Sequence, residues 1–233
     1  MRLDKFLCEM NIGSRSEVKA LLKQGLVTLN GAPVCSPNQK IDPKLDTVCF
    51  QGKQLEYRAH EYFMLHKPAG YVTATEDKHD KTIMELLPEN RRKDLFPVGR
   101  LDKDTEGLLL ITNDGALAHG LLTPKNLIPK TYLVHIAAPL NPEQITALTE
   151  GVDIGEKKLT QPAKIEVIDE YHIHLTIHEG KFHQVKRMLQ AVDNRVIYLK
   201  RLTFGPLNLD PDLKPGQCRR LTSSELENLA RTI

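Results

Sequence analysis

Residues 99–115 read GRLDKDTEGLLLITNDG, a charged loop that runs directly into an apolar segment. The run GLLLIT at 107–112 has the length and composition of a buried strand. The loop before it holds three carboxylates within five residues, and loops beside core strands commonly carry catalytic groups. From the residues alone three interpretations stay open: a metal site at Asp102 and Asp104, a glycosidase-like pair of carboxylates, or a surface turn. Lys103, between the two aspartates, disfavours a bound cation.

On either side of this stretch, short apolar runs alternate with short helical patterns from residue 62 onward. Strands are expected at 62–66, 97–100, 107–112, 131–137, 163–168, 172–178 and 195–199, and helices at 83–87, 116–121, 142–150 and 182–192. A further helix is expected after Thr222-Ser223-Ser224-Glu225, which has the form of a capping box. Because the strands are not evenly interleaved with long helices, the pattern predicts an α+β fold whose sheet is mixed and mainly antiparallel.

The beginning of the chain has a pattern of its own. Apolar residues at helical spacing predict a helix from Leu3 to Gly13, and Ser14-Arg15-Ser16-Glu17 is a second capping box that opens another helix. Asn30-Gly31 is a strong hairpin signal. We therefore expect two domains, in which the first combines helices with a short hairpin. The expected boundaries are 1–57 for the first domain, 58–61 for a polar linker and 62–233 for the second domain.

Basic residues are concentrated in two places on a chain whose formal net charge is only +2. Residues 1–58 carry nine basic and six acidic residues, and residues 181–201 carry six basic residues and one acidic residue. Such concentrations predict two surfaces for a polyanion. No apolar run approaches the roughly 20 residues that a membrane span needs. Four cysteines without a C-x-x-C pair, and an N-terminus without a long apolar core, predict a reduced protein of the cytoplasm.

The segments RLDKFL at 2–7 and SRSEVKALLKQGLVTLNGAPV at 14–34 resemble the S4 RNA-binding domain, which has two short helices followed by a hairpin. The resemblance implies that structured RNA binds along the basic ridge of the second helix, chiefly through phosphates. The residues of this domain expected to contact RNA are Arg2, Lys5, Arg15, Lys19 and Lys23.

The stretch at 99–115 resembles the active-site signature of the RsuA-type ribosomal RNA pseudouridine synthases (the RsuA/RluB/E/F family). Four other segments match motifs of that family: HKPAGYV at 66–72, PKTYLV at 129–134, LTIHEGKFHQVKRML at 175–189 and VIYLKRL at 196–202. By this resemblance Asp102 is the catalytic nucleophile and Lys186 pairs with it, with Arg187 as the neighbouring candidate. The resemblance also implies that Tyr132 stacks on the target base and that Leu199 lines the uracil pocket. Further RNA contacts are expected from Lys67, Arg100, Lys181, His183, Gln184 and Arg187.

The same resemblance implies an isomerase that flips one uridine of bacterial ribosomal RNA out of its stack and converts it to pseudouridine. Likeness to the RsuA subgroup implies uridine 516 of the small-subunit 16S RNA, within a partly assembled subunit. No cofactor, metal or membrane partner is expected, since isomerisation needs no redox or phosphoryl-transfer chemistry, and we expect a monomer. Whether Asp102 attacks C1′, attacks the base or abstracts a proton stays open. The alternatives are a synthase acting on 23S RNA, a non-catalytic S4-type assembly factor, and an RNA N-glycosylase that releases free uracil.

Overall fold

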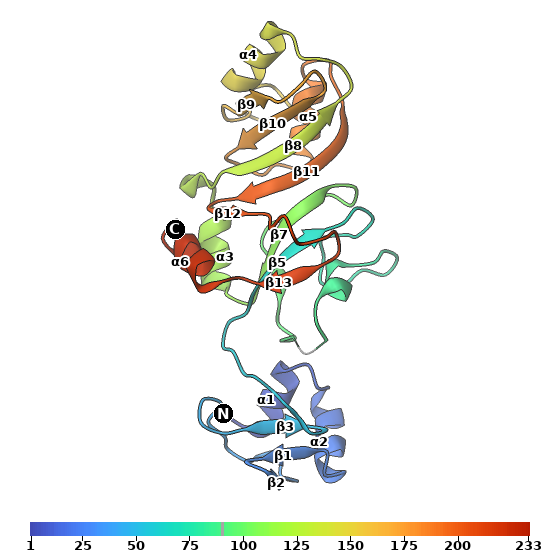
Figure 1. The fold of residues 1–233 in the computed structure, drawn as a ribbon, viewed down its shortest axis with the longest axis vertical. Coiled ribbons are helices and arrows are strands. Elements are labelled where there is room, and N and C mark those ends of the chain that lie inside the picture. The colour runs from blue at the N-terminus through green and yellow to red at the C-terminus, as the bar shows by residue number, and fades with distance from the viewer. Residues whose placement is uncertain (90) are drawn as a thin grey trace. The chain divides into compact units, whose positions relative to one another are not determined.

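The computed structural model describes residues 1–89 and 91–233, and the chain divides into two compact units (Figure 1). Unit 1 comprises Met1–Glu61 together with Leu87–Leu95, and unit 2 comprises Tyr62–Leu86 and Phe96–Ile233. The predicted α+β class is confirmed, since both units combine helices with sheets. No helix in the described ranges combines the length and the apolar character that crossing a bilayer requires.

Unit 1 packs two helices, α1 (Leu3–Glu9) and α2 (Arg15–Lys23), against a small sheet. The sheet has the order β2-β1-β3-β4, with β1 at Val27–Leu29, β2 at Ala32–Pro33, β3 at Val48–Phe50 and β4 at Lys53–Gln54. The predicted capping box is present, because the Ser14 side chain accepts a hydrogen bond from the Glu17 amide and the Glu17 carboxylate accepts one from the Ser14 amide. The first helix is shorter than predicted, since Asn11 at φ +58° leaves the helical region before Gly13.

The segment Leu87–Leu95 belongs to unit 1 although it is separated from the rest of that unit in sequence. Arg92, whose exposed fraction is 4%, attaches the segment. Its guanidinium donates to Glu9 at 3.1 Å and lies 5.3 Å from the centre of the Tyr57 ring, and its amide donates to Glu61 at 2.8 Å. No pattern in the sequence indicated this grouping, because it depends on contacts between residues about 30 to 80 positions apart.

Unit 2 is built on one sheet, which in its described residues has the order β13-β5-β7-β11-β8-β10-β9 and two short additions, β12 on β11 and β6 on β7. Among these strand pairs only β7 with β11 is parallel, as the expected mixed and mainly antiparallel sheet requires. The strands are β5 (Tyr62–Lys67), β6 (Phe96–Pro97), β7 (Glu106–Thr112), β8 (Lys130–Ile136), β9 (Lys164–Val167), β10 (His172–Ile177), β11 (Val196–Phe204), β12 (Leu207–Asn208) and β13 (Cys218–Arg220).

The helices of unit 2 are η1 (Ile83–Leu86), α3 (Gly115–Leu122), η2 (Pro124–Asn126), α4 (Pro142–Glu150), α5 (Gln184–Gln190) and α6 (Ser223–Ala230). The capping box at Thr222 opens α6 as predicted. Figure 1 shows α3 beside α6, and Leu117, Leu121 and Leu229 from these two helices share one core with Leu108 and Leu110 of β7.

Several predicted elements in unit 2 differ from the structure: the strand expected at 195–199 continues to Phe204, and the helix expected at 83–87 is the 3₁₀ helix Ile83–Leu86. Two further differences lie beside the candidate site. The strand expected at 97–100 stops at Pro97, because Val98 donates its last sheet-like hydrogen bond to Leu110 and Gly99 then turns at φ +76°. The helix expected at 182–192 begins at Gln184, because His183 adopts the left-handed conformation at φ +49°. Both departures place loop backbone, rather than regular structure, beside the residues discussed next.

Candidate active site

The backbone of the loop that carries Asp102 is hydrogen-bonded to a buried lysine. Lys67, at the end of β5, has an exposed fraction of 0%. Its ammonium donates to the carbonyl oxygens of Asp102 at 3.0 Å, Thr105 at 2.8 Å and Lys103 at 3.3 Å. Burial lowers the pKa of Lys67 to about 8, and the nearby Asp104 and Asp102 carboxylates offset part of that effect. The expectation that Lys67 contacts RNA is therefore wrong, because its ammonium is fully buried and donates its hydrogen bonds to carbonyl oxygens of the loop.

Thr73 makes a second attachment to the loop that carries Asp102. The hydroxyl of Thr73 donates to the carbonyl of Leu101 at 2.7 Å, and the amide of Leu101 donates back to that hydroxyl oxygen at 3.2 Å. Gly107 follows the loop at φ +107°, with its α-carbon against the backbone of Arg201 where β7 and β11 pair. These contacts fix the position of Asp102 relative to both strands.

The Asp102 carboxylate faces two basic side chains from the segment around α5, some 80 residues away in sequence. The amine of Lys186 lies 3.1 Å from Oδ2, and Nε2 of His183 lies 3.5 Å from Oδ1. Lys186 also donates to Asp104 at 2.6 Å. Burial acts to lower the pKa of Lys186, but its bonds to Asp104 and Asp102 outweigh burial and raise that pKa. The same contact, working against burial, lowers the pKa of Asp104.

Arg187, the neighbouring candidate for this pairing, points elsewhere. Its guanidinium donates to the carbonyl oxygens of Ile154 and Phe182 and to the Glu156 carboxylate at 3.1 Å. Successive residues on a helix project about 100° apart, which explains why Lys186 reaches Asp102 and Arg187 does not. The donors of Arg187 are committed within the unit, so the structure leaves it little capacity for the RNA contact expected of it.

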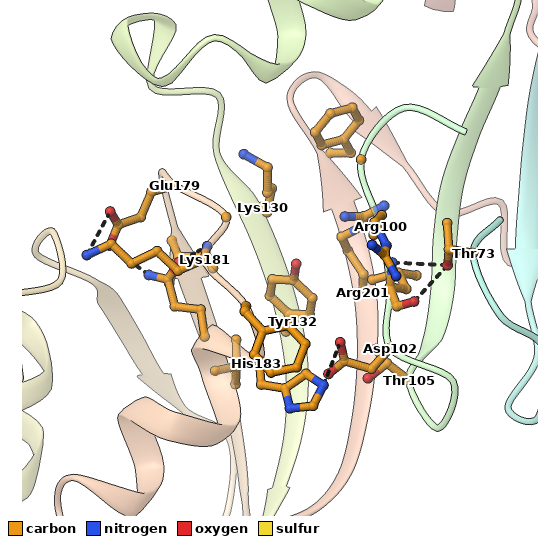
Figure 2. A pocket seen from close by; sticks show the side chains of 18 of the residues that line it. Thr73, Arg100, Asp102, Thr105, Lys130, Tyr132, Glu179, Lys181, His183 and Arg201 are labelled. Atoms are coloured by element: carbon orange, nitrogen blue, oxygen red, sulfur yellow. Dashed lines mark hydrogen bonds and ion pairs between the residues drawn. The ribbon is translucent and has the colours of Figure 1, made fainter. Parts of the chain in front are cut away.

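Asp102 opens onto a cavity of about 640 Å³, large enough for a nucleotide. Tyr132 of β8 and Leu199 of β11 line it, with exposed fractions of 7% and 6%. Tyr132 is paired across the strands with Arg201, and Leu199 with Val134, so the two pocket residues lie on one region of the sheet. Figure 2 shows Asp102, His183 and Tyr132 around the same space, with Lys130 beyond the tyrosine ring.

The remaining residues expected to bind RNA fall into two groups. Arg15, Lys19 and Lys23 are exposed on α2, whereas Arg2 is bonded to Asp4 at 2.6 Å and Lys5 lies 3.7 Å from Glu9. Around the cavity, Arg100 and His183 are exposed and Lys181 lies 3.5 Å from Glu179.

Gln184 is another expectation that the structure corrects. Its exposed fraction is 4%, its amide donates to Glu179 at 2.8 Å, and its carbonyl accepts from the Lys181 amide at 2.8 Å. These bonds tie the glycine turn to the first turn of α5. Gln184 is therefore a structural residue rather than an RNA contact.

Three cavity residues escaped the sequence reasoning. Phe182 has an exposed fraction of 73%, and its ring stacks on His183 with centroids 3.7 Å apart. Lys130 and Arg201 are buried in the cavity wall. The sequence did contain a pattern that indicated Lys130 and Arg201. Each lies two positions along a strand from a residue assigned to the pocket, and alternate strand residues share a face.

Comparisons with known proteins agree with this arrangement. Residues 61–191 match the family model described as RNA pseudouridylate synthase, and residues 1–48 match the S4 domain. A Bacillus subtilis protein named as an uncharacterized RNA pseudouridine synthase, YtzG, is 49% identical, with 98% of each chain covered. A Vibrio cholerae protein named ribosomal small subunit pseudouridine synthase A is 43% identical, covering 98% of this chain and 99% of that one. A crystal structure described as a pseudouridylate synthase superposes with a TM-score of 0.70 at 40% identity, covering 98% of this chain and 99% of that chain.

Proposed function

The chain belongs to the RNA pseudouridylate synthase family, whose members isomerise uridine in RNA to pseudouridine, and from that premise we propose that its substrate is bacterial small-subunit 16S ribosomal RNA at uridine 516. The observation that carries the target is the end-to-end match to a small-subunit enzyme, which extends over both units. A match confined to unit 2 would have supported the reaction but not the RNA.

The geometry around Asp102 supports this residue as the catalytic group. In the reaction the N1–C1′ bond breaks with its electron pair going to the uracil, a C5–C1′ bond forms, C5 loses a proton and N1 gains one. An ionised carboxylate serves either as nucleophile or as stabiliser of a cationic sugar. The Lys186 amine at 3.1 Å and the His183 ring at 3.5 Å hold this carboxylate at the edge of the cavity.

A uridine can reach Asp102 only after leaving its stack, because the carboxylate lies in the wall of a cavity. Tyr132 and Leu199 offer one aromatic and one aliphatic surface on which a flipped base can lie. At the mouth, the exposed ring of Phe182, supported from behind by His183, offers a surface for a neighbouring base of the RNA. In unit 1, the exposed basic residues of α2 supply phosphate contacts typical of an S4 domain.

The proposal is tested with ribosomal RNA that carries tritium at C5 of its uridines, offered as free 16S RNA, free 23S RNA and partly assembled small subunits. C5 deprotonation releases tritium, and site mapping then locates the product. We expect release from the small-subunit substrates at a single site and none from the Asp102→Asn protein, whose RNA affinity stays within a few-fold. Release from 23S RNA alone would overturn the target. Free uracil among the products would indicate a glycosylase, and tight binding without release would indicate an assembly factor.

A further inference from the structure

Two buried cations line the inner wall of the cavity. Lys130 has an exposed fraction of 9% and Arg201 of 2%. Lys130 precedes Tyr132 by two residues on β8, and Arg201 follows Leu199 by two residues on β11. Residues two apart on a strand share a face, so both cations lie beside the side chains that the flipped base is proposed to contact.

These cations have no carboxylate partner in the described part of the chain. The Lys130 amine donates to the Ile128 carbonyl at 2.8 Å, and Nε of Arg201 donates to the Leu108 carbonyl at 2.8 Å. Both charges lie over the ring of Phe204, at 5.5 Å and 5.1 Å from its centre. Nη2 of Arg201 is buried and, among the described residues, has no hydrogen-bond partner.

Such an arrangement is unfavourable by itself, because a buried charge without a counter-charge and a buried N–H without an acceptor both lose the solvation that water would give them. Burial, followed by the charge of Arg201, lowers the pKa of Lys130 to about 8, with the Glu179 carboxylate acting in the opposite direction. Glu179 is itself held by Lys181 and Gln184, so it does not neutralise the pair. The wall is therefore suited to a negative charge that arrives from outside the chain.

The reaction supplies that charge at the required place. Cleavage of the N1–C1′ bond leaves the electron pair on the uracil, where it spreads over N1 and the two carbonyl oxygens. Attack of Asp102 on C6 of the base would place negative charge on one of these oxygens, O4, and removal of a sugar proton would expel the same uracil anion. All three routes that stay open for Asp102 therefore develop negative charge on the base.

We propose that Lys130 and Arg201 form a cationic wall that stabilises the negative charge of the uracil in the transition state, with the Lys130 amine and Nη2 of Arg201 donating to its carbonyl oxygens. The inference rests on the proposed isomerase function and adds two catalytic residues to it. Donors aimed at developing charge accelerate a reaction because they bind the transition state more tightly than the neutral ground state. A backbone phosphate fits the wall less well, since it would bring two sugars to a depth where Arg201 is 2% exposed.

The test compares Lys130→Met with Lys130→Arg and with a matched control, Lys200→Met. Lys200 lies on β11 next to Arg201, but it is not among the residues that line the cavity. Single-turnover rate constants and RNA dissociation constants are measured on whichever RNA the wild-type protein converts. Failure of the 16S proposal would appear in the wild-type protein itself, so it stays distinguishable from failure of the cationic wall. Thermal unfolding of each variant confirms that it is folded.

We expect Lys130→Met to lower the single-turnover rate about 10²–10³-fold, the usual effect of losing one such donor, with the dissociation constant within about threefold of wild type. Lys130→Arg should recover most of the rate, and Lys200→Met should match the wild type. The wild-type rate should fall as the pH rises through about 8, where the Lys130 amine loses its proton beside Arg201, Glu179 and Phe204. Because the pKa of Lys67, which anchors the Asp102 loop, is also lowered to about 8, Lys130→Arg should reduce that fall without removing it.

Two results would overturn the proposal. The first is a Lys130→Met rate within about threefold of wild type, which is far smaller than the expected loss. The second is weaker RNA binding with an unchanged rate and a salt dependence reduced by about one charge, which would make Lys130 a phosphate contact.

Discussion

The glycine that follows the catalytic loop allows a sharp test of how the site is held. Gly107 has φ +107°, and a β-carbon placed on it would lie within 3.0 Å of three backbone atoms of Arg201. These atoms belong to β11 at its parallel pairing with β7. Gly107→Ala therefore has to push the two strands apart as well as hold a side chain in a conformation that favours glycine.

The free-energy costs of the strained backbone conformation and of the close contact can both be estimated. A non-glycine residue held in such a backbone conformation costs roughly 1–3 kcal/mol, and forcing extra volume into a packed site costs a further 1–3 kcal/mol or so. We expect Gly107→Ala to lose about 3 kcal/mol of unfolding free energy or more, which lowers Tm by about 6–12 °C for a chain of this size. Turnover should fall as well, because Arg201 and the Asp102 loop lie on either side of the contact.

Two other glycines separate the contributions. Gly70 has φ +90° with nothing within 4 Å of an added β-carbon, so Gly70→Ala measures the conformational penalty alone. Gly115 begins α3 with no atom within 4 Å and without a positive φ, so Gly115→Ala should be neutral or slightly stabilising. Urea unfolding followed by circular dichroism, with hydrogen exchange at β7 and β11, gives the three free energies. If Gly107→Ala loses no more stability than Gly70→Ala, the close approach of the strands is not what requires the glycine.

Three further predictions concern charge and stacking. Lys186→Met removes the cation 3.1 Å from Asp102 and should lower the single-turnover rate about 100-fold. This is the rate equivalent of about two to three kcal/mol for a charged hydrogen bond. An equal loss of rate in Asp104→Asn would contradict the assignment of Asp102 as the carboxylate that Lys186 serves. Phe182→Ala should weaken RNA binding about tenfold in a binding titration, as loss of a base-stacking surface does, and Phe182→Tyr should restore it. Bonds to Arg219 lower the pKa of Glu225 to about 2, so the stability from this pair is present above the ordinary glutamate pKa and is lost as pH falls from 4.5 toward 2. After solvent screening we expect about 1–2 kcal/mol, and acid unfolding of Glu225→Gln should lack that pH dependence.

Local signals in the sequence were sufficient for most of the elements. The capping boxes at Ser14 and Thr222 open α2 and α6, and the GLLLIT run forms β7. Such signals work because caps, turns and side-chain periodicity act over a few neighbouring residues. They failed where a single backbone conformation decided the boundary, as at His183, whose left-handed φ delays the start of α5.

The residues proposed for catalysis were reached by resemblance and not by local physics. Nothing near Asp102 in the sequence distinguished a catalytic loop from a charged turn. The structure adds the distances, which bring Lys186 and His183 to that carboxylate across about 80 residues of chain.

By itself the sequence determined the α+β class, most of the longer helices and strands, and the concentration of basic residues in two segments. Only the tertiary structure decided which basic side chains are buried and which groups they contact. Lys67 became a loop anchor, while Lys130 and Arg201 became an unneutralised wall of the cavity. The physical reason is that the cost of a charge depends on its burial and on its partners, which are set by the strands that become neighbours and not by adjacent residues.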